Sequence, residues 1–77
     1  MLILRLEFLS DEIVRYRYYP ENREDFGLIE LNRITGEINL KAEVKEYGSF
    51  YWRHAVYRID EYFEADNFPE KDMIAWY

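Results

Sequence analysis

The sequence predicts a single α+β domain over residues 1–77: a curled, four-stranded antiparallel β-meander with one C-terminal amphipathic helix packed on its apolar face. Two alternating segments, 26–32 and 37–44, flank a short turn, which is typical of a β-hairpin. Apolar residues in 50–66 then recur at helical spacing. Neither a half-apolar sheet nor an amphipathic helix can bury its apolar side alone, so the two layers are expected to pack together.

Alternation also predicts the first two strands. In residues 2–8 four apolar side chains, Leu2, Leu4, Leu6 and Phe8, fall on one face. A polar turn at 10–12 leads into a second strand at 13–19, which Pro20 ends because proline cannot donate to a strand ladder. Pairing of the two strands would gather four charged side chains on the open face of the sheet. They are Arg5, Glu7, Arg15 and Arg17.

The second pair of strands is predicted on either side of Gly36. The segment 26–32 carries Ile29 and Leu31 on one side, and 37–44 alternates strictly between apolar and polar residues. Glycine adopts the left-handed conformation that such a hairpin turn needs without steric cost, so Gly36 is expected to have a positive φ. Each strand therefore has one buried and one wet face.

The helix is predicted from Phe50 to about Asp66, with Ser49 as the N-cap and Asn67 as the residue that ends it. Its apolar stripe consists of Trp52, Ala55, Val56, Ile59 and Phe63. The tail, residues 73–77, is apolar and ends on two aromatic residues. Because chain termini are usually polar, this tail is expected to be buried, as a short extra edge strand or against a partner.

Composition narrows the class of protein. The chain has no cysteine, which excludes disulfides and thiolate metal sites and favours a reducing cytoplasm. A net charge of −6 argues against general nucleic-acid binding. No segment reaches the roughly 20 apolar residues that a membrane-spanning helix needs, and the N-terminus lacks the pattern of a signal peptide. We therefore expect a cytoplasmic protein that does not enter a membrane.

No motif for catalysis, cofactor binding or metal binding is present, and the sequence does not decide whether the chain is an enzyme, although the absence of such motifs favours a non-enzymatic role. His54, the single histidine, lies near Arg53 and Arg58 on the predicted helix and has no orienting carboxylate at helical spacing. These three residues define one alternative: a small enzyme or ligand-binding domain with a tyrosine-lined cleft. The ordinary interpretation of His54 is a packing or surface residue of the helix.

The leading hypothesis is a small interaction module. Tyrosine, tryptophan and arginine are enriched at binding hot spots, and this chain holds them in dense groups. The expected interface residues are Tyr16, Arg17, Tyr19, Trp76 and Tyr77. The partner would be a second copy, forming a homodimer, or another protein. A third hypothesis places an anionic partner on Arg5, Arg15 and Arg17.

Several short motifs resemble a family of small uncharacterised bacterial proteins. They are Tyr16-x-Tyr18-Tyr19-Pro20-Glu21, Thr35-Gly36-Glu37, His54-Ala55, Phe68-Pro69-Glu70 and the ending Met73-x-Ala75-Trp76-Tyr77. The resemblance covers most of the chain, and the ending is its most specific part. It implies a small bacterial cytoplasmic protein. It brings no activity, and no site residue is carried over from it.

Overall fold

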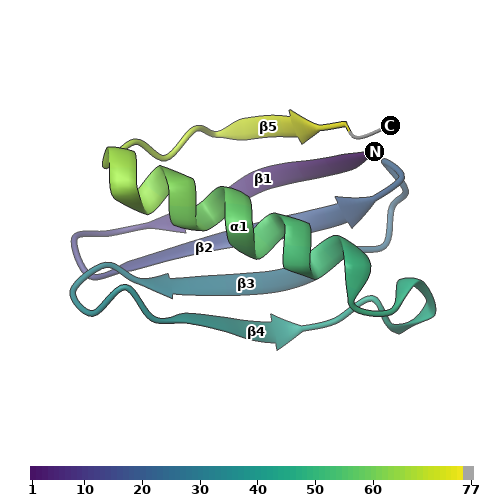
Figure 1. The fold of residues 1–77 in the computed structure, drawn as a ribbon, viewed down its shortest axis with the longest axis horizontal. Coiled ribbons are helices and arrows are strands. Elements are labelled where there is room, and N and C mark those ends of the chain that lie inside the picture. Colours follow the sequence, from purple (N-terminus) through teal and green to yellow (C-terminus); the bar gives the residue numbers. More distant parts are fainter. Residues whose placement is uncertain (76–77) are drawn as a thin grey trace.

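A computed structural model describes residues 1–75 as an antiparallel sheet with one helix packed on one face (Figure 1). The strands are β1 (Leu2–Leu9), β2 (Ile13–Pro20), β3 (Gly27–Asn32), β4 (Ile38–Ala42) and β5 (Lys71–Ile74). A short 3₁₀-helix, η1 (Lys45–Tyr47), precedes the helix α1 (Phe50–Ala65). The predicted α+β class and the packing of the helix on an antiparallel sheet are confirmed.

The sheet has five strands in the order β4-β3-β2-β1-β5, so the prediction of four strands is wrong. The helix carries the chain from the β4 edge back across the sheet, and β5 then pairs antiparallel with β1 (Figure 1). An extra strand was expected within the tail 73–77, but β5 begins earlier, at Lys71. The early start was not predictable because Lys71 and Asp72 interrupt any apolar pattern.

The core lies between α1 and the face of the sheet that the helix covers. From the sheet it contains Leu2, Leu4, Val14, Tyr16, Tyr18, Ile29 and Leu31. From the helix, Ala55, Ile59 and Tyr62 are buried, with Trp52, Val56 and Phe63 packed against them. The predicted stripe is therefore confirmed, and Tyr62 extends it by lying one turn beyond Ile59 on the same side.

The first strand departs from strict alternation at a β-bulge. Leu6 pairs with Tyr16, but the next pair is Phe8 with Arg15, so Glu7 is an extra residue in β1. As a result Phe8 lies on the open face and is 46% exposed, although alternation placed it in the core. The sequence prediction for Phe8 is wrong because one inserted residue reverses the face of everything that follows it.

The helix begins at Phe50 with Ser49 at the N-cap position, as predicted, but two details of its ends differ. Ser49 has helical backbone angles (φ −91°, ψ −11°), and its side chain makes no capping hydrogen bond. The helix ends at Ala65, and Asp66, rather than Asn67, takes the left-handed conformation with φ 51°. There its backbone N–H donates to the carbonyl groups of Tyr62 and Phe63, which satisfies the last turn.

The hairpin between β3 and β4 follows the prediction at its turn. Gly36 has φ 81°, and its N–H donates to the Asn32 carbonyl oxygen at 2.8 Å. The strands themselves are shorter than expected, because Phe26 precedes β3 and Val44 follows β4. Val44 is nevertheless buried, and its N–H donates to the Tyr18 hydroxyl at 3.0 Å.

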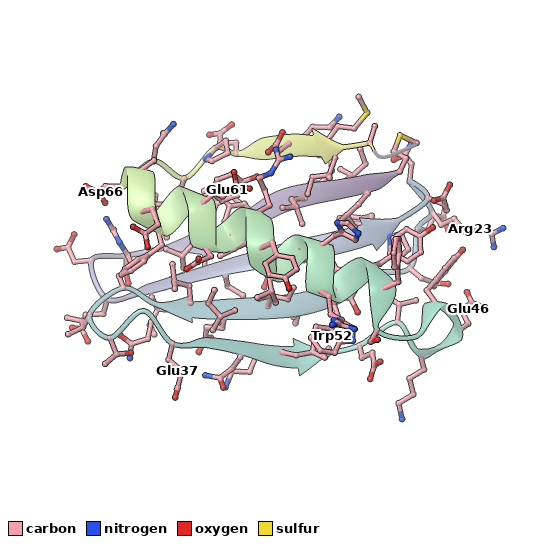
Figure 2. The ribbon with its side chains drawn as sticks, viewed as in Figure 1. Arg23, Glu37, Glu46, Trp52, Glu61 and Asp66 are labelled. Carbon is pink, nitrogen blue, oxygen red and sulfur yellow. The ribbon has the colours of Figure 1, made fainter. Side chains whose placement is uncertain are left out.

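Trp52 joins the helix to the β4 side of the core. In Figure 2 its side chain extends from α1 toward β4, whereas the labelled acidic residues Glu37, Glu46 and Asp66 lie at the periphery. The indole Nε1 of Trp52 is the one buried side-chain polar atom of residues 1–75 without a hydrogen-bond partner. The ring is thus held by packing rather than by a polar contact.

Candidate functional site

The face of the sheet opposite α1, called here the open face, carries several of the candidate residues. Because side chains alternate along a strand, burial of Val14, Tyr16 and Tyr18 on the helix side places Arg15, Arg17 and Tyr19 on the open face. The views in Figures 1 and 2 are from the helix side, so the open face lies behind the sheet in both.

Two arginines of β2 are held in place by carboxylates on the neighbouring strands. Arg15 donates from Nε and Nη2 to Oε2 of Glu30, at 3.1 and 2.9 Å. Arg17 donates from Nε to Oε1 of Glu7 at 3.1 Å, and Arg15 Nη1 lies 3.9 Å from Glu7 Oε2. The sequence prediction that Glu7, Arg15 and Arg17 meet on the open face is confirmed by these contacts.

Exposed aromatic rings lie against the same two arginines. The Arg17 guanidinium lies 4.3 Å from the centre of the Phe26 ring, and that of Arg15 lies 5.5 Å from the Phe8 ring. Tyr19 adds a third ring, 5.5 Å from Phe26. Phe8 and Phe26 remain 46% and 40% exposed. These arginine–aromatic contacts are cation–π pairs that are still accessible to a partner.

A row of like charges crosses three neighbouring strands of the open face. Arg5 on β1 lies directly opposite Arg17 on β2 and directly opposite Lys71 on β5. We call Arg17, Arg5 and Lys71 the cation row. Like charges placed directly opposite each other destabilise a sheet. Glu7 offsets the charge of Arg17, but no side chain of residues 1–75 forms an ion pair with Arg5 or Lys71.

The cation row lines a hollow on the open face with a volume of about 660 Å³. The acidic residues Glu7 and Glu70 and the rings of Phe8 and Tyr19 also border it. Lys71 reaches this hollow because β5 pairs beside β1, which brings two segments far apart in the sequence together. The hollow therefore combines uncompensated positive charge with aromatic surface.

Removal of the central charge of the cation row is expected to stabilise the protein. Arg5→Gln should raise the free energy of unfolding by about 0.2–1 kcal/mol at low salt, because it relieves repulsion from Arg17 and Lys71. The gain should shrink in 0.5 M NaCl, where charges on the surface are screened. Urea unfolding at both salt concentrations measures it.

Lys41→Gln is the matched control for this prediction. Lys41 lies on β4, and its Nζ is 3.9 Å from Glu30 Oε1 on the neighbouring strand β3. Because this cation is paired with a carboxylate, its removal should give no such gain. A loss of stability in Arg5→Gln at low salt would contradict the repulsion that we infer.

The second group predicted from the sequence is only partly brought together. Phe50, Arg53, His54 and Tyr57 border a shallow depression of about 280 Å³ on the outer side of α1. The His54 ring contacts the Phe50 ring, with centroids 4.6 Å apart. Arg58, in contrast, does not line this depression. The structure therefore separates Arg58 from the predicted His54 cleft.

Arg58 instead fastens β5 to the helix. Its Nη1 donates to Asp72 Oδ2 at 2.9 Å, and its Nε lies 3.4 Å from Glu61. The Tyr62 hydroxyl donates to the same Asp72 oxygen. This arrangement gives Arg58 a structural role in holding the fifth strand.

The predicted interface residues fall in different places. Arg17 and Tyr19 lie on the open face, as described above. Tyr16 is 1% exposed, and its hydroxyl donates to the Pro69 carbonyl oxygen at 2.6 Å, so it belongs to the core and not to a surface. Trp76 and Tyr77 lie outside the described residues.

Sequence reasoning missed three residues of the open face. Phe26 and Phe8 were assigned to strands without their contacts to arginine, and Lys71 was not placed on a strand at all. One signal was available for Phe26. It lies three residues before the buried Ile29, and an odd separation along a strand places two side chains on opposite faces. Nothing local in the sequence marks Lys71, because its position depends on pairing between the two ends of the chain.

Comparisons with known proteins give no further information about this site. No protein-family model matches the chain, and no match was found among curated proteins or solved structures. Within residues 1–75 no group of three or more His, Cys, Asp or Glu side chains is placed to hold a metal ion. No helix of the described part of the chain is long and apolar enough to cross a membrane.

Proposed function

We propose that this chain is a small non-enzymatic module that binds another protein through the open face of its sheet. The observation that carries the proposal is the pairing of Arg17 with the exposed ring of Phe26, 4.3 Å away, on a central strand. Arginine and aromatic side chains are the types that most often dominate binding energy at protein interfaces. Arg17 stands on the central strand β2 and Phe26 directly precedes β3, so little conformational entropy is lost when they bind.

A different protein is favoured over a second copy by the charges of this face. In a symmetric dimer the same patch would meet itself. A pairing centred on the cation row would then bring Arg5 and Lys71 close to their own copies, which is repulsive. The chain as a whole has a net charge of −6, so positive charge concentrated here marks this face as distinct from the rest of the surface.

The alternative function, a small enzyme or ligand-binding domain at Arg53, His54 and Arg58, has weaker support. Arg58 is engaged with Asp72 and Glu61 instead of facing His54. The depression beside His54 has less than half the volume of the hollow on the open face, about 280 against 660 Å³. It is bordered by rings and an arginine.

Affinity capture with matched surface variants tests the proposal. The purified protein, a Phe8→Ser/Phe26→Ser variant and a Tyr57→Ser control are immobilised and exposed to a lysate of the source organism. Tyr57 is a suitable control because it is 66% exposed on the helix, away from the open face. A protein retained by the wild type and by the control, but lost by the double variant, is the expected result.

Quantitative binding with the captured protein gives the size of the effect. Loss of hot-spot residues typically costs about 2 kcal/mol or more, which corresponds to roughly thirtyfold in affinity. Circular dichroism and thermal melting must show that the double variant is folded. Retention by the double variant together with loss in Tyr57→Ser would contradict the proposal and point to the helix side.

Light scattering of the purified protein tests self-association separately. A dimer that dissociates in the Phe8→Ser/Phe26→Ser variant would keep the open face as the binding surface but make a second copy its partner. A monomer at all accessible concentrations is the expected result.

A further inference from the structure

The charges around the hollow of the open face do not balance locally. Arg17 is compensated by Glu7, with Nη2 and Oε1 3.1 Å apart. Arg15 is compensated by Glu30, outside the hollow. The remaining charged groups at the hollow are Arg5, Lys71 and the carboxylate of Glu70. The described residues therefore leave one positive charge uncompensated on a chain whose net charge is −6.

The register of the sheet fixes these cations in one line. Arg5 stands directly opposite both Arg17 and Lys71, so the cation row runs across β2, β1 and β5. Neighbouring strands lie about 4.8 Å apart, and the row therefore spans roughly 10 Å at the level of the backbone. Repulsion within the row is a cost to the folded state that a bound anionic group would relieve.

The dimensions fit an elongated anion better than a single small ion. The volume of about 660 Å³ far exceeds that of one phosphate or carboxylate group. In an extended peptide, side chains on the same side recur every 6.6 Å or so, which lets two acidic side chains reach separate members of the row. Phe8 and Tyr19 border the hollow and can cover the aliphatic parts of such a segment.

Nucleic acid also carries a line of negative charges, but this chain is a poor candidate to bind it. Affinity for nucleic acid depends on many neutralised phosphates, and the net charge of −6 repels the flanking backbone beyond the hollow. An acidic protein segment with only two or three carboxylates carries fewer negative charges, so the net charge of the chain repels it less.

We propose that the cation row Arg17–Arg5–Lys71 binds an acidic, extended segment of a partner protein through its carboxylates. The inference rests on the proposed function, because it assigns the chemistry of the partner that the open face binds. Arg5 and Lys71 provide the uncompensated charge, and Arg17 is held by Glu7 at the inner end of the row.

The test uses the purified full chain and defined probes. ¹⁵N-labelled protein is titrated with a capped hexaglutamate peptide, with inorganic phosphate and with an oligothymidylate, all at matched ionic strength. Hexaglutamate is expected to shift the amide signals of β1 and β5 around the row. Binding should weaken roughly two- to fivefold in Arg5→Gln and in Lys71→Gln, as for exposed charge pairs. Lys41→Gln, which removes a cation of β4 paired with Glu30, should bind as the wild type does.

Three results would overturn the inference: tighter binding of oligothymidylate than of hexaglutamate, equal saturation of the row by phosphate alone, or an equal loss in Lys41→Gln. The proposed function is judged separately by the captured protein. If that protein is lost by Phe8→Ser/Phe26→Ser but retained by an Arg5→Gln/Lys71→Gln variant, the open face is the interface, and the inference that the partner presents an acidic segment is wrong. If hexaglutamate binds the row and no protein is captured, the cation row does bind acidic peptides, but the proposed function as a protein-binding module is wrong.

Discussion

Gly27→Ala is expected to be the most damaging single substitution that adds only one carbon atom. Gly27 is buried at the start of β3, opposite Tyr18. A Cβ at this position would overlap the Tyr18 ring and would lie 2.6 Å from the Ala42 carbonyl oxygen. The ring is packed in the core and the carbonyl belongs to the backbone of β4, so neither can move aside at low cost.

The expected cost therefore lies at or above the upper end for overpacked cores, about 3 kcal/mol. For a chain of this size, a loss of 3 kcal/mol corresponds to a decrease in melting temperature of about 12 °C or more. Thermal and urea unfolding, followed by circular dichroism, measure the change. A loss below about 1 kcal/mol would contradict the close packing of Tyr18 on Gly27.

Gly48→Ala is the matched comparison because at this position glycine is needed for its backbone conformation and not for lack of space. Gly48 has φ 63° and ψ −152°, a backbone conformation that other residues rarely adopt. A Cβ there would meet no atom within 4 Å. Its cost is backbone strain alone, about 1–3 kcal/mol. We expect Gly27→Ala to be the more destabilising of the two.

The fold was predictable as far as local patterns reach. Alternation in residues 13–19 and the helical stripe around Ile59 both depend on short-range order, and both are confirmed. The fifth strand and the bulge at Glu7 depend on pairing between distant segments. A four-residue strand with two polar members has no periodicity of its own, so only its partner β1 defines it.

The candidate surface was predictable to a similar extent. Alternation placed Arg15 and Arg17 on one face, and antiparallel pairing brought Glu7 to them. Lys71 joined the row only because the helix returns the chain to the β1 edge. Helical proximity suggested that Arg58 faces His54, but Asp72 of the same returning strand draws Arg58 to the other side.

Three buried tyrosines are expected to make the protein unfold in alkali. Tyr16, Tyr18 and Tyr62 are 1%, 1% and 8% exposed. Burial raises the pKa of each hydroxyl above the ordinary value of 10.0, and for Tyr62 the hydrogen bond to the Asp72 carboxylate raises it further. The folded state therefore keeps these protons at a pH where the unfolded chain has lost them.

The sign of the effect follows from this difference in bound protons. Below pH 10 both states are protonated and the full stability is present; as the pH rises above 10, only the unfolded state loses protons and stability falls. Each buried tyrosine contributes a slope of about 1.4 kcal/mol per pH unit, so together they give roughly 4 kcal/mol per unit. A domain of this size is typically stable by about 4–12 kcal/mol, which places unfolding between about pH 11 and about pH 13.

Single tyrosine-to-phenylalanine variants separate this cause from general alkaline damage. Tyr62→Phe, Tyr16→Phe and Tyr18→Phe each remove one ionisable hydroxyl, so each should reduce the slope of stability against pH by about 1.4 kcal/mol per pH unit. Their stabilities at pH 7 will differ, because the Tyr18 hydroxyl accepts from buried Val44 N–H, whereas that of Tyr16 donates to Pro69. The slope depends only on the protons released, so it is independent of that difference. An unchanged slope in all three variants would mean that the hydroxyl groups ionise without unfolding, and that burial by the helix does not keep them neutral.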